Sequence, residues 1–98
     1  MGEFSGQNVL VTGASSGIGW HAARKFSGAG AVVLAHYNQN AAGAAKLGVT
    51  TVQADLGVTV EPLKEAVKKH LGGRVDVLVN NAGSLIERRK IVEMDADL

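Results

Sequence analysis

Three glycines follow the apolar run Val9–Val11 at the spacing G-x-x-x-G-x-G. Gly13 permits a sharp turn, Gly17 leaves room for a phosphate beside the backbone, and Gly19 lets a following helix pack closely on a sheet. A helix that starts here offers unpaired N–H groups and the positive end of its dipole, which together bind a pyrophosphate. The predicted cofactor-binding residues of this loop are Gly13, Ser15, Ser16, Gly17, Ile18 and Gly19.

The spacing of this loop differs from the G-x-G-x-x-G pattern of many dinucleotide-binding loops. The alternative interpretation is a glycine-rich turn with no ligand. An apolar strand directly before the loop, a helical pattern directly after it and Thr12 in front of it favour the dinucleotide site. We therefore expect NADP or NAD as the cofactor.

The segment His36-Tyr37-Asn38 indicates which of these two cofactors is favoured. It ends the second predicted strand, where an acidic side chain would accept hydrogen bonds from the ribose 2′-hydroxyl of NAD and repel the 2′-phosphate of NADP. The segment has no carboxylate, so NADP is favoured, although it also has no arginine to pair with the phosphate. His36 is the candidate phosphate contact, and the alternative is an ordinary packing or surface histidine.

A sheet must hold this loop, and four mostly continuous apolar runs predict its strands. Continuous runs indicate a parallel sheet with both faces covered. Strands alternating with helices, joined by right-handed crossovers, predict an α/β fold, a Rossmann-type doubly wound parallel sheet in the order 3-2-1-4. The first two helices should cover one face and the third helix the other. The four runs are Val9–Val11, Ala31–Ala35, Thr51–Val52 and Val75–Val79.

Three helical patterns lie between these runs. In the first and third patterns apolar residues recur every four positions, whereas the second pattern is rich in alanine. One or two glycines follow each pattern and predict where the helix ends. The third pattern also has a possible cap, Thr59, and a proline, Pro62, in its first turn. The patterns and their stops are Ile18, Ala22 and Phe26 before Gly28 and Gly30; Ala41 to Leu47 before Gly48; and Leu63, Val67 and Leu71 before Gly72 and Gly73.

Three parts of the sequence together resemble the short-chain dehydrogenase/reductase family, classical subtype. They are Thr12-Gly13-Ala14-Ser15-Ser16-Gly17-Ile18-Gly19, Asn80-Asn81-Ala82-Gly83 and Asp55. Their order and spacing cover nearly the whole chain. The resemblance implies an NAD(P)-dependent oxidoreductase that transfers hydride between the cofactor and a small-molecule carbonyl or alcohol.

The resemblance also implies contacts beyond the glycine loop. The carboxylate of Asp55 would bind the adenine amino group. In the tetrad Asn80-Asn81-Ala82-Gly83 at the end of the fourth strand, the last three residues would line the ribose and nicotinamide side of the cofactor. Asn80 is better interpreted as a brace between the central strands. The alternatives are a turn residue at Asp55 and a ligand-free strand-end turn for the tetrad. The implied cofactor contacts in these segments are Asp55, the Leu56 backbone, Asn81, Ala82 and Gly83.

The catalytic residues that the resemblance implies are not found in the sequence. The family's reaction uses a tyrosine, a lysine four positions later, and a serine and an asparagine nearby. Tyr37 is the only tyrosine, Ala41 stands four positions after it, and no asparagine follows Asn81. We therefore assign no catalytic residue and expect the 98-residue chain alone to be inactive. Two interpretations stay open: the truncated front half of an oxidoreductase, and a stand-alone, non-catalytic dinucleotide-binding module.

Composition limits the remaining classes of function. With 98 residues, 46% hydrophobic and 19% charged, we expect a single partial NAD(P)-binding domain over residues 1–98. No acid occurs from Phe4 to Ala54, but the three cations there are too few for a nucleic-acid patch. The sequence has no cysteine and no apolar run long enough for a membrane span. We expect a cytoplasmic protein with no metal site, and a homo-oligomer.

Overall fold

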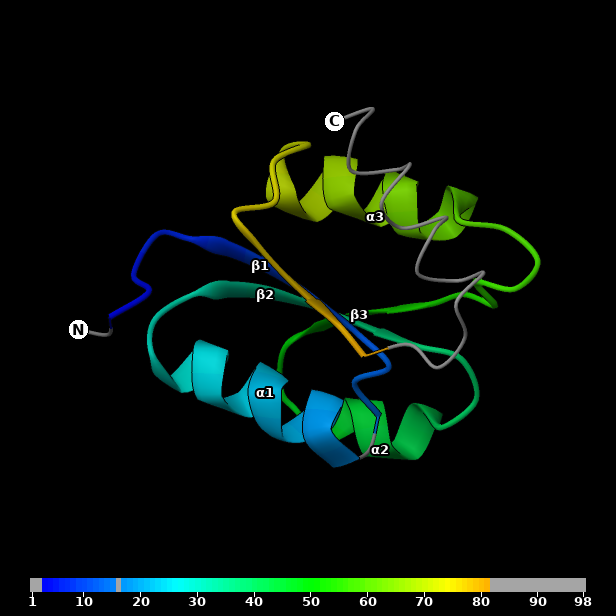
Figure 1. The fold of residues 1–98 in the computed structure, drawn as a ribbon, viewed down its shortest axis with the longest axis horizontal. Helices are drawn as coiled ribbons and strands as arrows, with labels where there is room; N and C mark the ends of the chain where they lie inside the picture. Colours follow the sequence, from blue (N-terminus) through cyan, green and yellow to red (C-terminus); the bar gives the residue numbers. More distant parts are fainter. Residues whose placement is uncertain (1–2, 16, 82–98) are drawn as a thin grey trace.

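The computed structural model describes residues 3–15 and 17–81. Within these residues, four parallel strands form one sheet in the order β3-β2-β1-β4, as predicted. Figure 1 shows α1 and α2 on one face of this sheet and α3 on the other, which confirms the predicted layers. The elements are β1 (Asn8–Thr12), α1 (Gly17–Gly28), β2 (Val32–Tyr37), α2 (Ala41–Ala45), β3 (Thr50–Gln53), α3 (Glu61–Leu71) and β4 (Val77–Asn80).

Helix α1 buries a face that agrees only in part with the one that its apolar spacing predicted. Gly19 and Ala23 are its buried residues, and Phe26 packs partly buried against the same core. Ile18, predicted to lie on the buried face, is 78% exposed. Successive residues of an α-helix are turned by about 100°, so a contact line through Gly19 and Ala23 directs Ile18 away from the sheet.

Helix α3 ends at the predicted glycine, but its N-cap lies one residue after the predicted cap. The residue before its first turn is Val60, whereas the predicted cap was Thr59. The Thr59 hydroxyl still accepts a hydrogen bond from the Glu61 N–H at 3.2 Å, so it stabilises the helix start from one position further back. At the other end Gly72 has a φ of 64° and donates its N–H to the Val67 carbonyl, which is a glycine stop of the expected kind.

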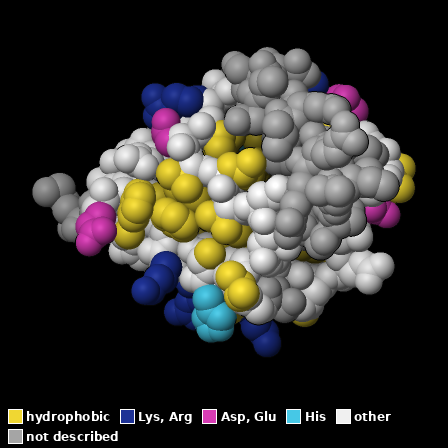
Figure 2. Space-filling model, in the orientation of Figure 1, with side chains coloured by type: hydrophobic (Ala, Val, Ile, Leu, Met, Phe, Trp, Pro, Cys, Tyr) yellow, Lys and Arg dark blue, Asp and Glu magenta, His cyan; other side chains and the backbone are white. Residues whose placement is uncertain are grey.

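The two edge strands of the sheet differ in polarity. Strand β3 reads Thr-Thr-Val-Gln, whereas β4 reads Val-Leu-Val-Asn, and every residue of β4 is partly exposed. In Figure 1, β4 is the orange strand that lies in front of the other strands of the sheet. Figure 2 shows apolar side chains gathered at the surface on this side of the molecule.

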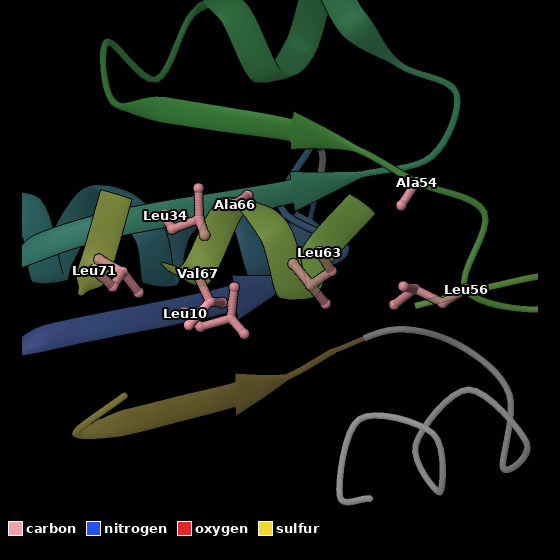
Figure 3. Close-up of a cluster of buried hydrophobic side chains, with 8 residues drawn as sticks. All are labelled: Leu10, Leu34, Ala54, Leu56, Leu63, Ala66, Val67 and Leu71. Carbon is pink, nitrogen blue, oxygen red and sulfur yellow. The ribbon is translucent and has the colours of Figure 1, made fainter. Parts of the chain in front are cut away.

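Side chains that alternate along β1 and β2 form one hydrophobic cluster on each face of the sheet. Leu10 and Leu34 point to the α3 side, where they meet Leu63, Val67 and neighbours, as Figure 3 shows. The other cluster lies toward α1 and includes Val9, Val11, Val33, Ala35 and Ala23. Because both faces of β1 and β2 are buried, their carboxyl ends are held rigidly at one edge of the sheet.

Candidate functional site

The glycine turn joins the carboxyl end of β1 to the start of α1. Gly13 has a φ of 64°, a left-handed conformation that glycine adopts without strain, so the predicted sharp turn is present. Its N–H donates to Nδ1 of His36 at 3.2 Å, and the next N–H, of Ala14, donates to the His36 carbonyl at 2.8 Å. These two amides are directed toward β2, so the amides that could meet a ligand come later in the turn.

The first turn of α1 provides such amides. The first N–H groups of an α-helix have no acceptor within the helix, and α1 carries no acidic residue in its first turn to repel an anion. Gly17 has a φ of 63°, and a Cβ built on it would have nothing within 4 Å. The space beside Gly17 is therefore open, as the binding of a phosphate there requires.

Gly19 lies against the strand end with no room for a side chain. A Cβ built on it would collide with the carbonyl of Gly13 and would lie 2.7 Å from Nδ2 of Asn81. The Gly13 carbonyl belongs to the backbone, and the Asn81 amide group is held by its hydrogen bond to that carbonyl. The close packing predicted for Gly19 is present, and it fixes the start of the helix against both β1 and the segment after β4.

Polar side chains tie the ends of β1 and β4 together. The Thr12 hydroxyl lies 3.3 Å from Oδ1 of Asn80 and accepts the Asn81 N–H at 3.0 Å. The Asn81 side chain donates through Nδ2 to the Gly13 carbonyl at 3.2 Å. The bracing role predicted for Asn80 is confirmed. Asn81 also braces the turn, so its amide group supports the site whether or not it contacts a ligand.

Three of the predicted cofactor contacts, Ser16, Ala82 and Gly83, lie outside the described residues. Ser15 is partly exposed at the turn, and Ile18 is exposed directly after it. These two residues and the glycines therefore lie together at the carboxyl edge of the sheet, where parallel α/β sheets bind their ligands.

The position of His36 argues against the phosphate contact that the sequence suggested. Its side chain is 3% exposed and lies on the same face of β2 as Leu34. Nδ1 accepts from Gly13, and Nε2 lies 2.8 Å from the Ala54 carbonyl. The ring nitrogens are thus engaged within the protein, and we do not include the His36 ring among the groups that contact the cofactor.

Asp55 follows β3 and shapes a turn. Its carboxylate accepts the Gly57 N–H at 3.0 Å, and its carbonyl accepts the N–H groups of Val58 and Thr59. Asp55 is therefore a turn residue, which was the alternative interpretation of this position. The residue is exposed, so its carboxylate can also reach an external amino group. The Leu56 side chain is 1% exposed in the α3 cluster, which leaves only its backbone for a ligand.

A contact that the sequence analysis missed joins α2 to the glycine turn. Asn40 donates through Nδ2 to the Ser15 carbonyl at 3.2 Å and accepts the Gly43 N–H at 3.0 Å as the cap of α2. Trp20 Nε1 donates to the Gly43 carbonyl at 3.0 Å. The asparagine before an alanine-rich segment signals a cap, but no pattern in the sequence indicates what the capped helix touches.

The part of the chain that the structure describes holds no group of three or more metal-ligating acids or histidines. In residues 3–15 and 17–81, no helix combines the length and the apolar character needed to cross a bilayer.

Known proteins are similar to this chain in sequence and in fold. A family model for the short chain dehydrogenases matches residues 7–97. Meso-2,3-butanediol dehydrogenase of Serratia marcescens is 38% identical, over 97% of this chain and 45% of that protein. Sorbose reductase of Schizosaccharomyces pombe is 33% identical, over 100% of this chain and 43% of that protein. The solved structure of the angucycline C-6 ketoreductase LanV with bound NADP is 37% identical, with a TM-score of 0.71 over 85% of this chain and 38% of LanV. The chain thus spans less than half the length of these relatives.

Proposed function

Because the chain belongs to the short-chain dehydrogenase family, we propose that it forms the NADP-binding part of an oxidoreductase. The observation that carries this proposal is the open space at Gly17, at the first turn of α1, where the first N–H groups have no acceptor within the helix. Gly13, Gly19 and Asn81 hold this turn rigidly against the strand ends. When bound, the nicotinamide in its reduced form would give a hydride to a carbonyl substrate, and in its oxidised form it would accept a hydride from an alcohol substrate.

The preference for NADP rests on the end of β2. Tyr37 is partly exposed and Asn38 is exposed, and neither carries a carboxylate that would repel a 2′-phosphate. The NADP found in LanV supports this preference. We expect NADPH to bind more tightly than NADH by a small factor, because no arginine stands in His36–Asn38 to pair with the phosphate.

We further propose that the 98-residue chain binds the cofactor without catalysis. The family's proton-transfer pair is a tyrosine with a lysine four positions later, and this sequence holds no such pair: its one tyrosine, Tyr37, ends β2 in the cofactor-binding part, and Ala41 stands four positions after it. The carbonyl or alcohol substrate would be handled by residues of a longer protein. A stand-alone binding module is the alternative, and a downstream reading frame that encodes a serine and a Tyr-x-x-x-Lys motif would decide for the oxidoreductase.

Titration calorimetry of the purified chain with NADPH and NADH tests the proposal. We expect saturable binding of both, with the lower dissociation constant for NADPH, and no oxidation of NADPH when carbonyl compounds are added. Binding of neither cofactor would overturn the proposed function. Tighter binding of NADH would overturn the cofactor preference alone.

A further inference from the structure

The buried imidazole of His36 bridges two segments that are far apart in sequence. Nδ1 accepts the N–H of Gly13 at 3.2 Å, and Nε2 lies 2.8 Å from the carbonyl of Ala54. A carbonyl oxygen accepts only, so Nε2 must carry the proton, and Nδ1 must lack one in order to accept from Gly13. These two partners therefore assign a neutral ring with its hydrogen on Nε2.

The backbone next to this ring reinforces the same bridge. The His36 carbonyl accepts the Ala14 N–H at 2.8 Å, and the Tyr37 carbonyl accepts the Ala54 N–H at 3.0 Å. The end of β2 thus holds the glycine turn on one side and the start of the Asp55 turn on the other. The His36 ring contacts both segments.

We propose that His36 is a positioning residue that couples the glycine turn to the Asp55 turn, without touching the cofactor itself. This proposal rests on the function proposed above, in which the glycine turn binds the pyrophosphate. By accepting the Gly13 N–H, the ring keeps that amide turned inward and fixes where the later amides of the turn lie. The Gly13 N–H is partly buried, and the loss of its acceptor is unfavourable enough to change the affinity of a dependent site about tenfold.

Three substitutions of His36 separate its two hydrogen bonds. In His36→Asn the side-chain oxygen can occupy the place of Nδ1 and accept from Gly13, while the bond to Ala54 is lost. In His36→Gln the terminal amide can occupy the place of Nε2 and donate to Ala54, while the bond from Gly13 is lost. His36→Leu removes both bonds. Leu34→Val, in the same buried strand and on the same face, is the control: it should lower stability while both hydrogen bonds of His36 are kept.

Two measurements compare these variants: the hydrogen exchange of the Gly13 amide and the affinity for NADPH. Hydrogen exchange of the Gly13 amide, followed by NMR, should stay slow in wild type, His36→Asn and Leu34→Val, and become fast in His36→Gln and His36→Leu. NADPH affinity should fall about tenfold in the same two variants and remain within about twofold of wild type in the other two.

The outcomes distinguish this proposal from the proposed function. If every protein, wild type included, fails to bind NADPH, the proposed function is wrong, and the exchange of Gly13 alone decides whether His36 holds the turn. Unchanged exchange in folded His36→Leu would overturn the positioning role. So would equal losses of NADPH affinity in all four variants, because that pattern would follow stability rather than the Gly13 hydrogen bond.

Discussion

Single backbone positions decide which groups of the glycine turn face a ligand. Gly13 and Ala14 direct their amides to His36, whereas Gly17 stands beside open space in a left-handed conformation. A substitution at Gly17 therefore combines a conformational cost with a filled binding space. Gly72, at the end of α3, has nearly the same φ and the same open surroundings but lies outside the site.

This pairing gives the first prediction. Gly17→Ala and Gly72→Ala should each lower the free energy of unfolding by about 1–2 kcal/mol, because an L-residue is strained at positive φ. Only Gly17→Ala should weaken NADPH binding, by about tenfold or more, because its methyl group enters the phosphate space. Urea unfolding and titration calorimetry measure the two effects. Equal NADPH affinities in the two variants would remove Gly17 from the site.

The second prediction concerns the choice of cofactor. Tyr37 is the last residue of β2, twenty positions after Gly17 and partly exposed, which is where an acid contacts the ribose of NAD. We expect Tyr37→Asp to shift the ratio of NADPH to NADH affinity toward NADH by about tenfold, because a carboxylate repels the 2′-phosphate. Thr50→Asp adds the same charge at the other end of the neighbouring strand β3 and should leave the ratio unchanged.

The same substitution at His36 should act differently. His36→Asp would place a carboxylate in a buried site, facing the Ala54 carbonyl, so it should lower stability rather than change the cofactor. Fluorescence titrations with both cofactors and a thermal melt separate these effects. A switch produced by His36→Asp and not by Tyr37→Asp would contradict this assignment of positions.

At the scale of elements, the order of the strands could be predicted from sequence because continuous apolar runs and right-handed crossovers leave few alternatives. The buried face of α1 could not, since the contact of Gly19 with the Gly13 carbonyl sets the rotation of the helix, and a glycine adds nothing to an apolar pattern. Side chains alternate between the two faces of a strand, so the sequence could have placed His36 on the same face of β2 as Leu34, which is buried.

The contact of α2 with the glycine turn could not be predicted from the sequence pattern either. This contact gives the third prediction. Alanine replaces a helical glycine favourably, by up to about 1 kcal/mol, when the methyl group has space. Gly28, in α1, has such space, whereas a Cβ on Gly43 would collide with the Ser15 carbonyl and the Asn40 side chain. We expect Gly28→Ala to raise and Gly43→Ala to lower the free energy of unfolding, measured with urea. Stabilisation by both substitutions would show that α2 does not press on the glycine turn.

At the scale of the whole molecule, the two sheet edges should behave differently. The β3 edge carries threonine and glutamine, whereas β4 offers Val77, Leu78 and Val79 beside backbone groups that, among the described residues, pair on one side only, with β1. Apolar strands with an unpaired edge promote association between copies of a chain. A domain of this size also has a small free energy of unfolding.

We therefore predict that the 98-residue chain self-associates through β4 and melts at low temperature. Sedimentation velocity at increasing protein concentration should show growth beyond the monomer. Val77→Lys, which places a charge on this edge, should shift the distribution toward the monomer, because burying an ammonium group between two copies is unfavourable. Thr51→Lys is the matched control: Thr51 is also partly exposed and lies in the other edge strand, so this change should leave association unaltered. A thermally robust monomer at all concentrations would contradict the prediction, and equal effects of the two lysines would attribute the association to net charge rather than to the apolar edge of β4.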